Sequence, residues 1–347
     1  MRTANRFADG VGNWSGNFTP AVLTGPAYPS MWRPTRGVSE NADMNESQTT
    51  PPSVAGRSGP SIERVGVIGC GLMGSGIAEV CARAGLDVLV REVDAAACEA
   101  GRSRTVGSLD RGVRSAKLTE AERDAAVAHL AFTTDIADMA DRQLVVEAVM
   151  EDEQAKIDVF RQLDRAVTSA DAILASNTSS IPIMKLGINT QRPENVIGIH
   201  FFNPVPVLRL VELVTSLLTS PETTERASGF ATEVLHKRVI RSQDRAGFVV
   251  NALLIPYILS AIRMLESGFA TADDIDAGMV EGCNHPMGPL HLADLIGLDT
   301  TMAVADSLYA EFKEPLYASP PLLSRMVEAS LLGRKTRRGF FDYQAAK

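Results

Sequence analysis

The stretch RVGVIGCGLMG, at residues 64–74, places a short apolar run directly before a glycine-rich turn. Residues 64–68 predict a strand buried on both faces, because strands inside a parallel sheet are continuous β-branched runs. A helix is expected from about residue 73 to residue 84. A GxGxxG turn between a strand and a helix is typical of a dinucleotide site, since the helix N-terminus attracts the pyrophosphate.

Each glycine of this turn has its own predicted task. Gly69 allows the tight turn, Gly71 lets the backbone approach the pyrophosphate, and Gly74 lets the helix pack closely on the strand. Leu72 and Met73 lie at the start of the helix and are included in the predicted cofactor site.

Glu92 follows a second predicted strand at residues 87–90 and decides the expected cofactor. A carboxylate there accepts hydrogen bonds from the ribose hydroxyls and repels a 2'-phosphate, which favours NAD. Arg91 argues for NADP, because an arginine can pair with that phosphate. Alternation along the strand turns Arg91 away from Glu92, so NAD is predicted and NADP is the alternative. A helix cap is the competing role for Glu92, and Asp94 can fill that role instead.

Downstream, strands and helices alternate. Further buried strands are predicted at 144–149, 172–175 and 196–201, and helices at 95–115 and 153–167. This alternation predicts an α/β fold with a Rossmann-like, doubly wound and mainly parallel sheet.

After about residue 244 the pattern becomes all-helical, with helices expected at 247–267, 271–283, 299–311 and 320–332. We therefore expect a Rossmann-like NAD-binding domain at 61–243 and a helical substrate and dimerisation domain at 244–347. Residues 1–60 are rich in Gly, Pro, Ser, Asn and Thr and lack periodicity, which predicts a disordered N-terminal extension.

Composition limits the class of protein. The net charge of -8 argues against nonspecific nucleic-acid binding. The four cysteines include no CxxC pair, which is typical of reduced thiols, and no histidine or cysteine cluster has the spacing of metal ligands. No apolar run reaches the roughly 18 residues of a membrane helix. We expect a soluble, cytoplasmic protein without a metal.

His200, in the run GIHFFNP at 198–204, is the candidate general base. Oxidising an alcohol with a nicotinamide requires a group that takes the hydroxyl proton, and the unperturbed pKa of histidine lies near neutral pH. Glu212, at the end of LRLVE, is the candidate to orient the imidazole.

Seven motifs carry a family resemblance: GCGLMGSGIAEV at 69–80, VVEAVMED at 145–152, ASNTSS at 175–180, HFFNPVPV at 200–207, GFVVNALL at 247–254, HPMGPL at 285–290 and GRKTRRGFF at 333–341. From about residue 62 to residue 343 the chain resembles the 3-hydroxyacyl-CoA dehydrogenases, especially the bacterial 3-hydroxybutyryl-CoA dehydrogenases. The resemblance implies reversible oxidation of a short-chain (S)-3-hydroxyacyl-CoA to the 3-oxoacyl-CoA. It also implies NAD as the cofactor, an acyl-CoA as the substrate and a homodimer.

The same resemblance implies roles for single residues. His200 and Glu212 match the pair that performs the proton chemistry. Ser179 and Asn251 match positions that hydrogen-bond the reacting oxygen or the carbonyl region of the substrate. Helix capping is the other role open to Ser179. Asn251 falls inside a predicted helix, where asparagine is a poor helix former, so a functional or packing role has to explain it.

Further residues match the cofactor and CoA positions of the family. Glu151 and Lys156 match positions around the nicotinamide half and the thioester, and a solvated helix start is their alternative. Lys335 resembles a cofactor-proximal lysine, with a solvated surface as its alternative. Ser108 matches a CoA-binding serine, but Ser115 stands where the family often carries a basic residue for the CoA phosphates.

Two alternative functions stay open. One is a dehydrogenase of a free hydroxy or sugar acid, as in the related gulonate dehydrogenases. The other is a noncatalytic, crystallin-like NAD-binding protein. The presence of both His200 and Glu212 argues against the second, because a retired site need keep neither.

Overall fold

The computed structural model describes residues 61–344 of the 347-residue chain. The predicted disordered extension at 1–60 lies outside the described residues. No helix within residues 61–344 is both long enough and apolar enough to cross a membrane.

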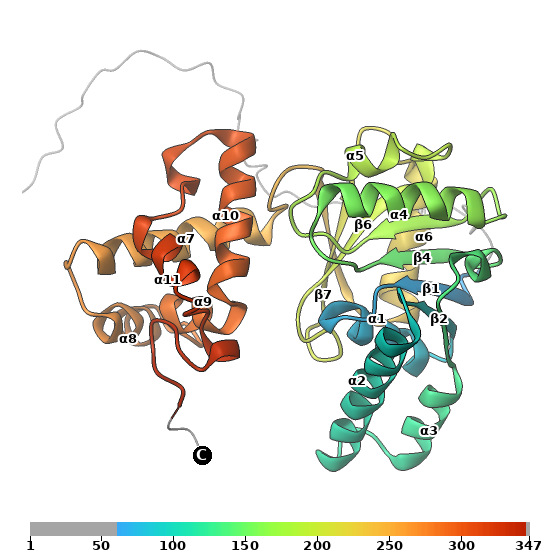
Figure 1. Ribbon diagram of the computed structural model, residues 1–347, viewed down its shortest axis with the longest axis horizontal. Helices are drawn as coiled ribbons and strands as arrows, with labels where there is room; N and C mark the ends of the chain where they lie inside the picture. Colours follow the sequence, from blue (N-terminus) through green and yellow to red (C-terminus); the bar gives the residue numbers. More distant parts are fainter. Residues whose placement is uncertain (1–60, 345–347) are drawn as a thin grey trace, which may run out of the picture. The chain divides into compact units, whose positions relative to one another are not determined.

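An eight-stranded sheet organises residues 64–243 (Figure 1). Its strand order is β3-β2-β1-β4-β5-β6-β7-β8, and β1 to β6 are parallel. Strand β7 is antiparallel to β6, and β8 is parallel to β7. The predicted Rossmann-like, mainly parallel sheet is therefore confirmed. The strands are β1 Arg64–Ile68, β2 Asp87–Arg91, β3 Leu130–Thr133, β4 Leu144–Glu147, β5 Ile173–Ser176, β6 Val196–Phe201, β7 Leu210–Thr215 and β8 Arg238–Gln243.

Apolar side chains on alternate strand positions form two separate cores, one on each face of the sheet. In β4, Leu144 and Val146 enter one core, and Val145 enters the other. The first core also contains residues of α1 Leu72–Arg83, α2 Ala95–Arg114, α3 Glu120–Ala128 and α6 Pro221–Gly229. The second contains residues of α4 Glu153–Ala166 and α5 Ile183–Gly187. Coverage on both faces explains why the inner strands are apolar without interruption.

The residues after β8 are almost entirely helical, as predicted, and have a third core of their own. This core is formed by apolar faces of the helices that pack against one another, such as Ile258, Leu290 and Leu308. The helices are α7 Val250–Glu266, α8 Ala272–Cys283, α9 Pro289–Ile296, α10 Leu298–Phe312 and α11 Pro321–Glu328.

Two helix boundaries differ from the prediction for backbone reasons. Helix α7 begins at Val250 and not at residue 247, because Gly247 and Phe248 have φ angles of 75° and 48°. Helix α11 ends at Glu328 and not at residue 332, because Ser330, with a φ of 58°, turns the chain out of the helix. These left-handed conformations end or delay a helix whose side-chain pattern would otherwise continue.

Strands β3, β7 and β8 and helices α3, α5, α6 and α9 are not predicted by the local sequence pattern. Strand β7 is the most consequential omission, because it carries Glu212. A glutamate in the middle of a short apolar run argues against a buried strand, because a buried charge needs partners. The partners of Glu212 come from other elements, so the local sequence does not show them.

The GxGxxG turn provides a test of the fold. A Cβ atom at Gly74 would lie 1.8 Å from the carbonyl oxygen of Gly69, whereas a Cβ at Gly71 would meet no protein atom within 4 Å. We expect Gly74→Ala to destabilise the protein by about 3 kcal/mol or more, because backbone must move. The control Gly71→Ala changes only the N-cap preference of α1 and should cost about 1 kcal/mol at most. Equal losses of unfolding free energy in urea would contradict this account.

Candidate active site

His200 and Glu212 lie directly opposite each other on the antiparallel strands β6 and β7. Residues paired in this way have Cβ atoms close enough for their side chains to meet. The Nδ1 atom of His200 lies 2.7 Å from Oε2 of Glu212, and both side chains are buried. The register of the hairpin therefore brings together the two residues that the sequence analysis predicted as a pair.

The second oxygen of Glu212 binds the start of helix α7. Oε1 accepts hydrogen bonds from the backbone N–H groups of Val249, at 3.1 Å, and Val250, at 2.9 Å. Helix α7 has no side-chain cap of its own, so this carboxylate satisfies amides that would otherwise lack partners. The positive end of the helix dipole also favours a carboxylate at this position. Glu212 thus connects the imidazole to the first helix after the sheet.

Two aromatic rings hold the imidazole of His200. The centroid of Phe202 lies 4.6 Å from that of the imidazole, and the centroid of Phe248 lies 5.6 Å away in an edge-on orientation. The hydrogen bonds found among residues 61–344 use Nδ1 of His200 and do not involve Nε2. A carboxylate partner on Nδ1 assigns the ring proton to that nitrogen, which leaves the lone pair on Nε2.

Ser179 lies in the loop at residues 177–181, between β5 and α5. Its backbone N–H donates to Oε1 of Glu151 at 3.0 Å, and its side chain is half-buried. The capping alternative for Ser179 is wrong, since α5 begins at Ile183 without a side-chain cap. The same loop contacts β6, because Oδ1 of Asn177 accepts a hydrogen bond from the N–H of Phe201 at 2.9 Å.

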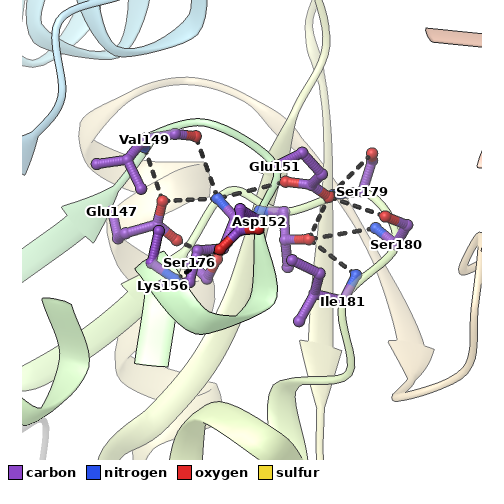
Figure 2. Close-up of polar contacts among 11 residues, drawn as sticks. Glu147, Val149, Glu151, Asp152, Lys156, Ser176, Ser179, Ser180 and Ile181 are labelled. Atoms are coloured by element: carbon purple, nitrogen blue, oxygen red, sulfur yellow. Dashed lines mark hydrogen bonds and ion pairs between the residues drawn. The ribbon is translucent and has the colours of Figure 1, made fainter. Parts of the chain in front are cut away.

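Lys156 is buried between two carboxylates (Figure 2). Its Nζ atom lies 2.6 Å from Oε1 of Glu147 and 3.3 Å from Oε2 of Glu151. Only 1% of the lysine side chain is exposed, so a solvated helix start does not describe it. Burial acts to raise the pKa of Glu151, but the Lys156 ammonium and the hydrogen bonds from the 178–180 loop hold that pKa below its usual range.

The GxGxxG turn has the geometry of a dinucleotide cradle. Gly69 has a φ of 86°, and Gly74 packs against it too closely for a side chain. Within residues 61–344, no atom packs against the side of Gly71 where a Cβ would lie, so packing does not require a glycine at this position. Helix α1 starts at this glycine without a side-chain cap. Leu72 is exposed at the first position of α1, while Met73 packs on the core. These residues fit a ligand with a pyrophosphate group.

Glu92 lies beside this turn, where its Oε1 accepts a hydrogen bond from the N–H of Cys70 at 2.5 Å. The capping role belongs to Asp94, which accepts a hydrogen bond from the N–H of Ala97 at 2.7 Å. The Arg91 side chain donates to the carbonyl oxygen of Thr134, away from Glu92. This arrangement agrees with the strand alternation from which NAD was predicted.

Among residues 61–344, three predicted site residues form no hydrogen bond or ion pair with His200, Glu212 or Ser179. Asn251 is the second residue of α7, so it belongs to the first turn and not to the helix interior, and its low helix propensity needs no special explanation there. Lys335 forms an ion pair with Asp299, with nearly half of its side chain exposed. Ser108, on α2, lies beside the buried Glu79 of α1, whose pKa burial raises while the Ser108 hydroxyl lowers it.

Sequence reasoning missed Glu147 and Asn177. Glu147 ends a strand of otherwise apolar residues and is completely buried, and Asn177 stands inside the ASNTSS motif. A single acidic residue in a buried run is a usable signal, because a buried charge must be paired. The signal does not identify the partner, which comes here from another element.

Two family models match the chain, and together they span almost all of the described residues. The NAD-binding domain of 3-hydroxyacyl-CoA dehydrogenase matches residues 64–245, and the C-terminal domain of 3-hydroxyacyl-CoA dehydrogenase matches residues 247–343. The chain belongs to the 3-hydroxyacyl-CoA dehydrogenase family. It is therefore an NAD-dependent oxidoreductase by family, as the sequence analysis expected.

Individual members of the 3-hydroxyacyl-CoA dehydrogenase family are similar over most of their length. A 3-hydroxybutyryl-CoA dehydrogenase of Mycobacterium tuberculosis is 60% identical over 283 residues, which cover 82% of this chain and 99% of the relative. The crystal structure of FadB2 from the same species has a TM-score of 0.81 and 60% identity, covering 82% of this chain and 100% of that chain. An (S)-3-hydroxybutyryl-CoA dehydrogenase from Ralstonia eutropha has a TM-score of 0.77 and 45% identity, with coverages of 82% and 100%.

The open space over Gly71 gives a prediction for cofactor binding. A methyl group at this position would occupy the place where a pyrophosphate approaches the backbone. We expect Gly71→Ala to raise the Kd for NAD at least about tenfold, which corresponds to about 1.4 kcal/mol. Titration of intrinsic or NADH fluorescence measures this Kd, and an unchanged value would show that the pyrophosphate does not approach Gly71.

Proposed function

We propose that this chain catalyses the reversible oxidation of a short-chain (S)-3-hydroxyacyl-CoA, 3-hydroxybutyryl-CoA, to the 3-oxoacyl-CoA. The contact of His200 Nδ1 with Glu212 is the observation that carries the proposal, because it leaves Nε2 as the basic nitrogen. The short acyl chain rests on the relatives, which are 3-hydroxybutyryl-CoA dehydrogenases at 60% and 44% identity.

His200 is the proposed general base. Its Nε2 takes the proton of the substrate 3-hydroxyl, and the Glu212 carboxylate stabilises the imidazolium that forms. NAD, when bound, supplies the acceptor for the hydride that leaves carbon 3. In the opposite direction the imidazolium returns its proton to the oxygen of the 3-oxo group. Phe202 and Phe248 pack against the imidazole and so limit its movement.

The neutral groups of the site have a supporting role in the proposal. Ser179 and Asn251 donate hydrogen bonds to the reacting oxygen or the carbonyl region, where a neutral donor stabilises negative charge without competing for the proton. Ser108 contributes to CoA binding, and Lys335 approaches the cofactor. The turn at Gly69, Gly71, Leu72, Met73 and Gly74 holds the pyrophosphate, and Glu92 binds the adenosine ribose.

The larger organisation is proposed on the same basis. Residues 61–243 form the NAD-binding domain, and residues 244–347 form a helical domain for substrate binding and dimerisation. A homodimer is supported by exposed apolar side chains in the helical part, where Leu253 and Phe269 are 74% and 79% exposed. A cytoplasmic location is supported by the free thiols of all four cysteines.

Substitutions at the pair separate binding from chemistry. His200→Gln should retain NAD binding and lower kcat by roughly 10²–10⁴-fold, as expected for the loss of a general base. Glu212→Gln should lower kcat to a similar extent and also lower Tm. The three groups that surround the Glu212 carboxylate are all N–H donors, and a glutamine offers them only one acceptor oxygen.

Stopped-flow and steady-state kinetics at several pH values, together with thermal unfolding, measure both variants. Full activity of His200→Gln would remove His200 from the mechanism. An unchanged Tm for Glu212→Gln would show that its bonds to α7 contribute nothing to stability.

Turnover of acetoacetyl-CoA tests the proposed reaction itself. We expect oxidation of NADH by the purified chain in its presence, with NADPH a poorer donor because Glu92 repels a 2'-phosphate. Absorbance at the NADH band follows the reaction. Turnover of a free 3-oxo acid with none of the CoA thioester would favour a gulonate-type dehydrogenase. NAD binding without turnover of either substrate would favour a noncatalytic, crystallin-like protein.

A further inference from the structure

Arg104 brings a positive charge from helix α2 to the glycine turn. Helix α2 lies against α1 (Figure 1), and it packs on the turn so closely that a Cβ atom at Gly101 would lie 2.7 Å from Cβ of Cys70. Arg104 stands one helical turn further along the same face of α2. Its Nη1 atom donates a hydrogen bond to the carbonyl oxygen of Cys70, the residue between Gly69 and Gly71.

Two side chains of opposite charge hold the backbone of Cys70. Glu92 accepts a hydrogen bond from its N–H, in the peptide that joins Gly69 to Cys70. Arg104 donates to its carbonyl oxygen, in the peptide that joins Cys70 to Gly71. Both charges also act on the buried thiol: burial foremost raises the pKa of Cys70 to about 11, Glu92 adds to this rise and Arg104 opposes it. Arg104 therefore lies on the Gly71 side of the turn, and Glu92 lies on the Gly69 side.

Most donors of the Arg104 guanidinium have no protein partner within residues 61–344. A guanidinium has five N–H donors, and only the bond to Cys70 uses one of them among these residues. In the same part of the chain Arg104 forms no ion pair with a carboxylate. Its neighbour Arg102 differs, because it lies 4.0 Å from Glu99 and over the ring of Phe132. Arg104 thus presents a positive charge that the described protein does not neutralise.

The cofactor carries a matching negative charge where it meets this turn. NAD has a pyrophosphate, and the start of α1 favours such an anion because its first turn has no side-chain cap and no acidic residue. The place of a Cβ atom at Gly71 is open, so the backbone can be approached there. A guanidinium binds phosphate oxygens through two parallel N–H donors. The charge of Arg104 and the approach to Gly71 therefore suit the same ligand group.

We propose that Arg104 is a cofactor-binding residue whose remaining guanidinium N–H groups bind the pyrophosphate of NAD, while its bond to the Cys70 carbonyl holds the side chain at the turn. The inference rests on the proposed function in one respect, namely that the pyrophosphate lies over Gly71. It adds a cation to a cofactor site that the sequence predicts from glycines, Leu72, Met73 and Glu92. The GxGxxG pattern does not reveal Arg104, because this residue comes from the following helix.

A series of ligands locates the anion that Arg104 binds. Adenosine has no phosphate, ADP adds the pyrophosphate, and 2',5'-ADP carries a 2'-phosphate in its place next to a single 5'-phosphate. Arg104→Gln is compared with Arg114→Gln, which removes an equal charge from an exposed residue in the last turn of α2. Displacement of NADH, followed by its fluorescence, measures the Kd of each ligand, and the Kd of NADH itself is titrated first for every variant.

We expect Arg104→Gln to raise the Kd for ADP and for NAD about tenfold, as for the loss of a hydrogen bond to a charged group. The Kd for adenosine should stay within about twofold of the native value, because adenosine lacks the anion. The difference between the native chain and Arg104→Gln should shrink as salt rises from about 0.02 M to about 0.5 M, since salt screens the interaction. Arg114→Gln should bind every ligand as the native chain does.

Arg104→Lys is the second variant and keeps the charge without the planar donor group. We expect a Kd for ADP between those of the native chain and Arg104→Gln, because an ammonium attracts phosphate but cannot bind it and the Cys70 carbonyl with the same fork. Equal rises of the Kd for adenosine and ADP in Arg104→Gln would show that Arg104 only shapes the turn. A greater loss of affinity for 2',5'-ADP than for ADP would assign Arg104 to a 2'-phosphate. Either result, or an unchanged Kd for ADP, would overturn the proposal.

These measurements need no turnover and so separate this inference from the proposed reaction. A native chain that binds NAD and does not turn over acetoacetyl-CoA would reject the proposed reaction, and the Kd values would still decide the role of Arg104. A native chain that binds neither ADP nor NAD would overturn both.

Discussion

The carboxylate of Glu212 is the constraint on which the arrangement of the site depends. One oxygen binds the imidazole of His200, and the other binds the two N–H groups at the start of α7. One side chain therefore fixes both the orientation of the proposed base and the start of helix α7, the first helix after the sheet. Its complete burial removes competition from water, which strengthens each of these bonds. The cost of burying the charge is offset only because all of its partners are donors.

Buried or half-buried carboxylates perform the same structural task at three other places. Asp244 accepts bonds from the N–H groups at the start of α5, and Asp276 does so at the start of α9. Asp294 accepts bonds from Phe340 and Phe341 in the C-terminal segment. Helices α5, α7 and α9 have no side-chain cap next to them in sequence. Their first turns are satisfied by residues that are distant in the chain, which ties separate elements together.

The loop at 177–181 is where the two polar networks of the site come together. Asn177 bonds the backbone next to His200, while Thr178 and Ser179 bond Glu151. A group that hydrogen-bonds the reacting oxygen must keep a fixed distance from the base, because small displacements cost rate. The loop is held from both sides, by β6 and by the Glu147–Lys156–Glu151 set. This explains why Glu147 and Lys156 are buried beneath a short loop.

The local sequence pattern was sufficient to predict much of the fold and part of the site. The RVGVIGCGLMG stretch, the apolar strands and the glutamate after the second strand predicted the Rossmann-like sheet, the pyrophosphate turn and NAD, because these depend on periodicity and backbone geometry within a few residues. The motifs around His200 and Glu212 also named the pair. Strand β7 and the partners of Glu147, Lys156 and Glu212 could not be predicted in this way. A buried charge is stable only beside hydrogen-bond donors. For Glu212, two of these donors are backbone N–H groups 37 and 38 residues further along the chain. Strand register and helix placement bring such partners together, and the sequence around the charged residue does not reveal them.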